Sequence, residues 1–150
     1  MSQSLLRLHV HLVFSTKRRA PLIFDHVRND LHPYMAVVMR NHGCHANLIN
    51  SVEDHVHILF ELGRTVSVSQ VVGEVKSSSS AWIKTRDVNC AGFAWQGGYG
   101  AFAVSESAVA VVRRYIARQR EHHAQRTFQE EYRLMLDRHG VSYDERYVWD

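Results

Sequence analysis

Two histidines separated by a single residue are the first feature of the sequence that could do chemistry. His55 and His57 lie in the segment Glu53-Asp-His-Val-His-Ile-Leu-Phe-Glu-Leu62, most of which is apolar. On a β-strand, side chains at i and i+2 share a face and start about 6.6 to 6.8 Å apart. Their imidazole nitrogens can then meet at one cation, about 2 to 2.3 Å from each. Because two ligands do not hold a catalytic divalent ion, the pair predicts a third ligand from elsewhere in the chain.

The segment Val111 to Gln119 supplies a candidate for that third ligand. If it is helical, Tyr115 and Gln119 are four residues apart, on one face and about 6 Å apart along the axis. Spacing alone leaves other interpretations open. The histidine pair could be inert, Tyr115 could be a packed residue of an amphipathic helix, and Gln119 could lie on the surface.

Alternating and helical apolar periodicities predict the elements that position these residues in the first half of the chain. They are a half-buried strand over Leu6–Phe14, a helix that Asp25 caps and that runs to His42 before Gly43, and a hairpin of strands over Cys44–Asn50 and His55–Leu62. In the second hairpin strand, Val56, Ile58 and Phe60 share one face and the two histidines share the other.

Similar signals divide the second half of the chain. They are a helix opened by the capping box Ser67–Gln70, a bent, glycine-rich strand within Gly92–Val104, a third helix from Ser105 or Ser107 to about His123, and a last helix from the capping box Thr127–Glu130 to Gly140. The aromatic tail, Val141–Asp150, is expected to pack on the body of the protein.

The order of these elements predicts an α+β fold. Strand, helix, strand, strand, helix, strand is the ferredoxin-like (RRM-like) βαββαβ order of an antiparallel sheet. Additional C-terminal helices follow, and the first of them carries Tyr115. We expect the first two helices to cover one sheet face and to leave the other open for function. No repeat or linker divides the chain, so residues 1–150 are expected to form a single domain.

Composition limits the classes of function. The chain has 150 residues, a net charge of +3 and a pI near 9.1, which permits nucleic-acid binding without requiring it. We expect no signal peptide, because the apolar stretch Ser4–Val10 is short and carries Arg7 and His9, and no membrane span, because no apolar run is long enough to cross a bilayer. Cys44 and Cys90 form neither a CxxC pair nor a disulfide framework, which favours buried thiols in a reducing cytoplasm.

At this point the motifs resemble a known family. His55-Val-His57 looks like the HUH motif, and Tyr115-Ile-Ala-Arg-Gln119 looks like its tyrosine partner. Together they resemble the single-tyrosine HUH transposases of the insertion-sequence-200/605-like family, which includes the REP-associated tyrosine transposases. Further matches, in the right order, cover nearly the whole chain: His11–Arg19, Trp95–Phe102, Thr127–Tyr132 and Tyr143–Asp150.

The resemblance implies site-specific nicking and rejoining of single-stranded DNA. Tyr115 would be the catalytic nucleophile, leaving a 5′-phosphotyrosine and a free 3′-hydroxyl. His55, His57 and Gln119 would hold a divalent metal ion, with Mg²⁺ or Mn²⁺ implied by the family. Ligand chemistry alone would also suit zinc, nickel or copper. His122 and His123 follow Gln119 closely and are expected beside the site at most.

The resemblance also implies partners. Family members recognise hairpin ends of single-stranded DNA and are dimers in which the tyrosine helix of one subunit can complete the site of the other. Gly97, Gly98 and Gly100 could be a pliable lead-in to such a helix or merely a tight turn. The candidate DNA contacts are the cations Lys17, Arg18, Arg19, Lys76, Arg113 and Arg114. The aromatic residues Trp95 and Tyr99, expected near the open sheet face, could stack on unpaired bases.

Two other classes of function remain as alternatives. A ferredoxin-like single-stranded nucleic-acid-binding module without catalysis could use the same open sheet face. A metal-dependent hydrolase of small molecules would need a group near the ion to activate water, and Glu53, Asp54 and Glu61 are near in sequence. Of these three classes of function, only a transposase is expected to form a covalent DNA adduct at Tyr115.

Overall fold

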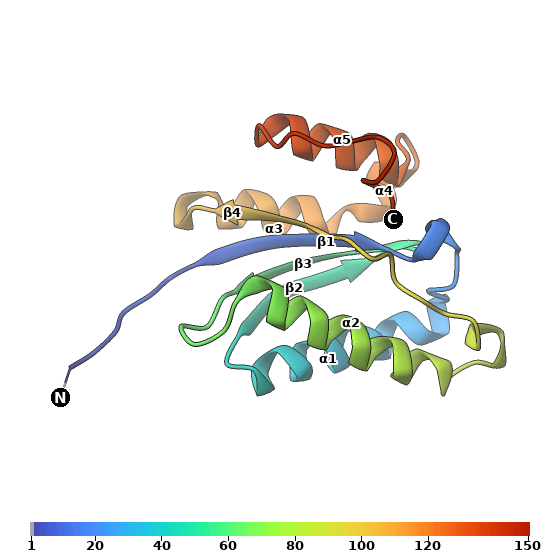
Figure 1. Cartoon of the computed structure of the whole chain (residues 1–150), viewed down its shortest axis with the longest axis horizontal. Coiled ribbons are helices and arrows are strands. Elements are labelled where there is room, and N and C mark those ends of the chain that lie inside the picture. The colour runs from blue at the N-terminus through green and yellow to red at the C-terminus, as the bar shows by residue number, and fades with distance from the viewer. Residues whose placement is uncertain (1) are drawn as a thin grey trace.

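The computed structural model describes residues 2–150 as one four-stranded antiparallel sheet with helices on both faces (Figure 1). Its strands are β1 (His9–Ser15), β2 (His45–Ser51), β3 (His55–Glu61) and β4 (Gly100–Val104). The spatial order β2-β3-β1-β4 is that of the ferredoxin-like fold. The predicted fold class is therefore confirmed.

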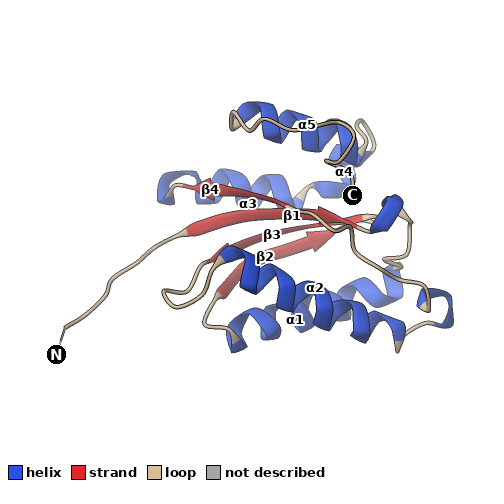
Figure 2. Cartoon of the chain, in the orientation of Figure 1, coloured by secondary structure: helices blue, strands red, loops and turns tan. Residues whose placement is uncertain are grey.

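The helices form two layers. Figure 2 shows one pair below the sheet and the later helices above it. The lower pair is α1 (Asp25–Asn41) and α2 (Val68–Lys84), and the upper group is α3 (Val109–Ala117), the short α4 (Gln119–His123) and α5 (Phe128–Arg138). Three-residue 3₁₀ turns lie at Lys17–Arg19, Val88–Cys90 and Glu106–Ala108.

The lower face of the sheet carries the larger hydrophobic core. Leu12, Phe14, Val56, Ile58 and Phe60 alternate along β1 and β3 and have no exposed surface. They pack against the apolar stripes of the two helices, which include Leu31, Met35, Val72 and Val75. Burying each such side chain stabilises the fold by about 1.5 to 3 kcal/mol.

A smaller core lies on the upper face, under α5. It contains Val13, Phe102, Phe128, Tyr132, Met135 and Leu136, with Tyr143, Val148 and Trp149 of the C-terminal segment packed on it. The expectation that this segment packs on the body is confirmed. Gly100 lets α5 approach β4, because a Cβ there would lie 2.6 Å from a ring carbon of Tyr132. Close packing is thus one reason for a glycine at this position.

Three of the four strands are shorter than predicted, and β2 has the predicted length but is shifted by one residue. β1 begins at His9 rather than Leu6, because its neighbours end opposite it: His9 pairs with Glu61 and with Val104. Leu6 and Leu8 are exposed. The prediction of a half-buried strand was also wrong, because β1 lies between β3 and β4 and is covered on both faces. Within Gly92–Val104 only the last five residues form a strand, preceded by an isolated bridge between Thr16 and Trp95.

Two predictions about the helices need correction. The third helix does not run to His123, because Arg118 (φ −100°, ψ 26°) ends α3 and separates it from α4. Asp25 begins α1 instead of capping it; Phe24 is the N-cap residue. The capping box at Ser67 is confirmed, because Ser67 and Gln70 form the reciprocal pair of hydrogen bonds. At the start of α5 the Thr127 side chain accepts a hydrogen bond from the Glu130 backbone N–H.

The expectation of an open sheet face was wrong. The face opposite α1 and α2 is covered by α3 and α5, whose apolar residues require burial (Figure 1). As for membrane insertion, none of the helices within residues 2–150 combines the length and apolar character that a bilayer crossing requires.

Candidate metal centre beside a tyrosine

Strand β3 points both histidines at the upper helices. Val56 and Ile58 face the lower core, so the alternation of the strand turns His55 and His57 to the opposite face. Neither imidazole has any exposed surface. Buried imidazoles need hydrogen-bond partners or a ligand for both ring nitrogens, and each ring has them.

The Nδ1 atom of each ring is fixed by a neighbour. His55 Nδ1 is 2.7 Å from Asp54 Oδ1, and His57 Nδ1 is 2.8 Å from Nε2 of His11 on the adjacent strand β1. Metal-binding histidines in proteins are held in this way by a partner at the second nitrogen, which fixes ring orientation. Both Nε2 atoms are left facing α5.

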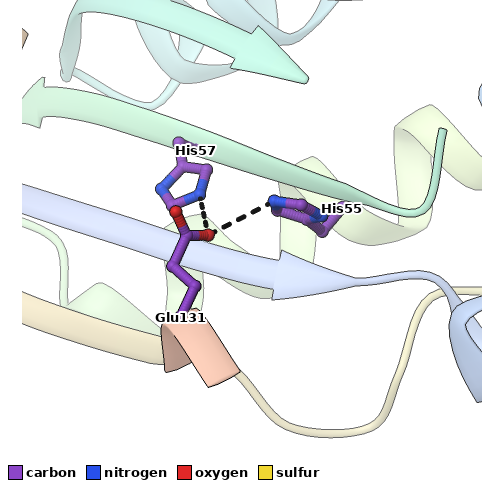
Figure 3. A group of neighbouring side chains, drawn as sticks. All are labelled: His55, His57 and Glu131. Atoms are coloured by element: carbon purple, nitrogen blue, oxygen red, sulfur yellow. Dashed lines mark hydrogen bonds and ion pairs between the residues drawn. The ribbon is translucent and has the colours of Figure 1, made fainter. Parts of the chain in front are cut away.

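Glu131 on α5 meets both of these nitrogens. Its Oε1 atom is 2.9 Å from His57 Nε2 and 3.4 Å from His55 Nε2 (Figure 3). The carboxylate is only 2% exposed. Ligand atoms of His55, His57 and Glu131 all lie within 4.8 Å of one another, so this group could hold a metal ion.

Gln119 also reaches the centre, on the side of His55. Its Oε1 atom is 3.4 Å from His55 Nε2 and 3.2 Å from His123 Nε2, and its side chain is fully buried. His123 in turn lies 3.4 Å from Glu131 Oε1, nearer the centre than expected. The structure thus brings together the three residues predicted as metal ligands and adds a carboxylate to them.

The donor set suits a divalent cation. Neighbouring ligands of an octahedral ion with bonds of about 2.1 Å are about 3.0 Å apart, close to the 2.9 and 3.4 Å separations around Glu131 and Gln119. Two imidazoles with a carboxylate and an amide oxygen are a mixed set that fits Mn²⁺ and Mg²⁺ better than imidazoles alone, although zinc sites also combine two histidines and a glutamate.

Tyr115 stands beside the centre and contacts it through the same carboxylate. Its hydroxyl donates a hydrogen bond to Glu131 Oε2. Its ring lies edge-on to His57 at 5.9 Å between centroids and is stacked on His122 at 4.6 Å. Burial and the negative charge of Glu131 raise the pKa of Tyr115 well above its usual value, so the residue rests as a neutral phenol.

Electrostatics keep the carboxylate charged. Burial tends to raise the pKa of Glu131, but hydrogen bonds from His123, His55 and His57 outweigh it and lower the pKa far below the usual range. Burial tends to lower the pKa of His55, but the hydrogen bonds and negative charges of Asp54 and Glu131 outweigh burial and raise this pKa. The pKa of His57 is lowered, chiefly by burial. An anionic carboxylate facing two imidazoles is an attractive site for a cation.

The cations expected to contact DNA lie in different places. Lys17, Arg18 and Arg19 are exposed at the end of β1, and Arg19 lines a cavity of about 460 Å³ with Asp54 and His123. Arg113 donates to the carbonyl oxygen of Asn47 at 2.8 Å, and Arg114 is exposed on α3. These five remain predicted contacts.

Two other candidates do not face the metal centre. Trp95 is 8% exposed and belongs to the lower core, where its Nε1 donates to Ser79. Its expected place near an open sheet face was wrong. The Lys76 amine donates to the carbonyl oxygens of Gln96 and Gly98, and burial lowers its pKa to about 8. It fixes the loop before β4, with the ring of Tyr99 5.7 Å away.

Glu131 is the residue that sequence reasoning missed. It directly follows the capping box Thr127–Glu130, and the sequence alone assigned it no role. The signal was its phase: Phe128, Glu131 and Met135 recur at helical spacing on the buried side of α5. A carboxylate on an apolar stripe requires a buried partner.

Comparison with known proteins agrees with this geometry. Residues 4–119 match the family model of IS200-like transposases. Among solved structures, a candidate transposase from Deinococcus radiodurans R1 matches with a TM-score of 0.62 and 22% identity, over 79% of this chain and 98% of the other. A REP-associated tyrosine transposase bound to a REP hairpin matches with a TM-score of 0.60 and 15% identity, over 82% of this chain and 74% of the other. No curated protein matches the sequence.

Fold and centre therefore define a class, the DNA-cleaving transposases with a four-stranded α+β domain. The chain belongs to the IS200-like transposase family, and the match spans both β3 and the tyrosine segment. Because the solved structures are only 22% and 15% identical to this chain, their similarity supports the fold alone.

Proposed function

We propose that this transposase cuts and rejoins single-stranded DNA through a covalent bond to Tyr115, assisted by a divalent cation. One observation carries the proposal: a single carboxylate, Glu131, contacts both His Nε2 atoms and the Tyr115 hydroxyl. A nucleophile and a cation site are thereby held side by side in one chain.

The proposed step is a phosphoryl transfer to tyrosine. The Tyr115 oxygen attacks the scissile phosphorus and forms a P–O bond to the 5′ side, while the bond to the 3′ oxygen breaks and that oxygen leaves as a hydroxyl. Glu131 Oε2, which already accepts the hydroxyl hydrogen, takes the phenol proton and releases it to solvent, and the leaving 3′ oxygen takes a proton from water. Attack by the 3′-hydroxyl of another strand reverses the step and rejoins DNA without ATP.

His55, His57 and Glu131 would hold the ion, with Gln119 as a further oxygen ligand. When bound, it would polarise the phosphate and stabilise charge on the leaving oxygen. Mg²⁺ or Mn²⁺ remains our prediction. Asp54 and His11 orient the two imidazoles, and the phenol stays protonated until substrate is present.

The substrate we propose is single-stranded DNA beside a hairpin, since one structural relative was solved with a REP hairpin. Lys17, Arg18 and Arg19 could contact its phosphates. The tyrosine and the histidines of one chain already meet, which favours cleavage within a single subunit. The homodimer remains a prediction, as does the assignment of residues 1–150 to a single domain.

A non-catalytic nucleic-acid-binding module is the second candidate. A buried carboxylate joining a tyrosine to two imidazoles contributes nothing to binding alone, and the imidazoles are closed to bases. The two candidates differ in one product, which is a DNA chain bonded to the protein.

Trapping that product tests the proposal. Wild-type protein with Mn²⁺ and radiolabelled single strands containing the hairpins that flank its own gene should form an adduct stable to denaturation. Mass spectrometry should place the DNA on the peptide containing Tyr115. Tyr115→Phe should form none, since it lacks the nucleophilic oxygen.

Tyr147→Phe, at an exposed tyrosine outside the centre and outside the candidate DNA contacts, is the matched control and should retain the adduct. Mixing Tyr115→Phe with His57→Ala chains shows whether sites are shared: recovery of cleavage means exchange between subunits. An adduct that persists in Tyr115→Phe would refute the proposed nucleophile.

A further inference from the structure

A groove lies between α3 and α5 and ends at the proposed nucleophile. It has a volume of about 580 Å³, within the range of about 300 to 1,000 Å³ of small-molecule pockets. Phe102 on β4, Tyr115 on α3 and Glu131 on α5 are among the residues that line it. It is therefore large enough to receive a nucleotide next to the tyrosine.

The burial of the metal centre makes this groove important. His55, His57 and Gln119 have no exposed surface, so a DNA strand cannot approach them across the sheet. Tyr115 is only partly buried and forms part of the groove wall. The cavity on the His123 side is not lined by Tyr115. The groove between the helices is therefore the route by which a phosphate can reach the tyrosine hydroxyl.

The walls of the groove have the character that unpaired nucleotides require. Val111 and Leu134 face it from the two helices and are 58% and 45% exposed, so apolar side chains on both walls are open to solvent. The ring of His139 lies 4.4 Å from that of Phe102, giving an aromatic floor. Flat apolar and aromatic surfaces bind bases irrespective of sequence.

The rim of the groove carries positive charge. Arg126 and Arg138 line it, and within residues 2–150 we find no acidic partner in an ion pair with either. Unpaired guanidinium groups beside an apolar channel match the alternation of phosphate and base along a strand. A second copy of this chain would gain from the apolar walls but not from these two charges.

We propose that this groove binds the unpaired nucleotides adjoining the scissile phosphate, with bases against Val111, Leu134 and His139 and phosphates at Arg126 and Arg138. The inference rests on the proposed function for the identity of the strand. It adds a binding site that is separate from the basic turn at Lys17–Arg19.

Binding of a fluorescein-labelled oligothymidylate, measured by anisotropy at low salt, tests the site. Leu134→Asp should weaken binding about fivefold or more, because it removes an apolar contact and repels phosphate. Arg138→Gln should lower the slope of log affinity against log salt by about one. Both residues are exposed, so the fold should survive.

Matched controls lie beyond the opposite face, near the end of α2. Val88→Asp introduces the same charge at a residue that is 89% exposed, and Arg86→Gln removes the same cation. Both should bind as wild type. If the groove variants bind no worse than these controls, the groove is not a DNA site.

Photocrosslinking with a bromodeoxyuridine oligonucleotide gives an independent readout. We expect crosslinks on the peptides containing Phe102 and His139, and crosslinks confined to other peptides would overturn the site. A Leu134→Asp variant that alters only the sedimenting mass would mark an interface between copies and would also overturn it. Binding lost in the groove variants without any adduct at Tyr115 in the wild type would instead support the groove and refute the chemistry.

Discussion

The two faces of the sheet are built from the same strands but hold very different residues. On the face toward α1 and α2, β3 contributes Val56, Ile58 and Phe60 to an apolar core. On the face toward α3 and α5 it contributes His55 and His57 to a polar centre. Stability is thereby concentrated on one face, which allows the other to bury polar groups that cost free energy unless they are paired.

Neighbouring substitutions on β3 should separate these two roles, and this is the largest effect we expect. His57→Ala should lower strand cleavage about a thousandfold, because it removes a proposed ligand of the ion. Ile58→Ala should instead lower the free energy of unfolding by about 2 to 5 kcal/mol, since it leaves a cavity in the larger core. Single-turnover cleavage and urea unfolding of both variants measure the contrast.

Cleavage by each variant is normalised to its folded fraction. Equal cleavage rates for His57→Ala and wild type would remove the polar face from catalysis. A loss in Ile58→Ala as deep as that in His57→Ala would show that the two faces are not separable.

The next effect concerns the carboxylate that closes the polar face. Glu131→Gln preserves shape but removes the charge opposite the imidazoles, so Mn²⁺ affinity should fall about tenfold or more. Calorimetry or Mn²⁺ electron paramagnetic resonance measures this without DNA. Glu130→Gln, the exposed neighbour on α5, is the control and should bind Mn²⁺ like the wild type. Equal affinities for both variants would exclude Glu131 as a ligand.

The smallest effect concerns a histidine that serves structure alone. His32 on α1 bonds Ser51 Oγ at 2.8 Å, and burial, helped by the positive charge of Arg28, lowers its pKa to about 4. The pKa of a histidine in the unfolded chain is about 6.5. Below that pH the unfolded chain binds a proton at His32 that the folded chain does not bind until about pH 4. The free energy of unfolding should therefore fall as pH drops from about 6.5 to about 4, by less than about 1.4 kcal/mol per unit, because partial exposure screens the charge.

Urea unfolding across that pH range, with a chelator present, measures this slope. His32→Gln should reduce this slope without abolishing it, because burial also lowers the pKa of His11, to about 3. His26→Gln, at an exposed position on the same helix, should leave the slope unchanged. An unaltered slope in His32→Gln would assign the acid sensitivity to other groups.

The same contrast explains what could be predicted from sequence. The alternation of β3 and the order of the elements follow from local periodicity, so the fold and the shared face of His55 and His57 were accessible. The sequence did not predict that helices cover that face. Helix α5 follows β3 by more than sixty residues, and its docking depends on tertiary contacts. The break at Arg118 was hidden too, since nothing in Tyr115–Gln119 interrupts helical propensity.

The absence of a methyl group from Gly100 has a consequence for how this protein can vary. Any larger residue there would collide with the Tyr132 ring, one position after Glu131, and would push the start of α5 outward. The Glu131 carboxylate would then move away from His55 and His57, although none of these three residues had been changed. An exchange to alanine, at a strand position far from the site residues in sequence, should therefore weaken the centre without altering any of its side chains.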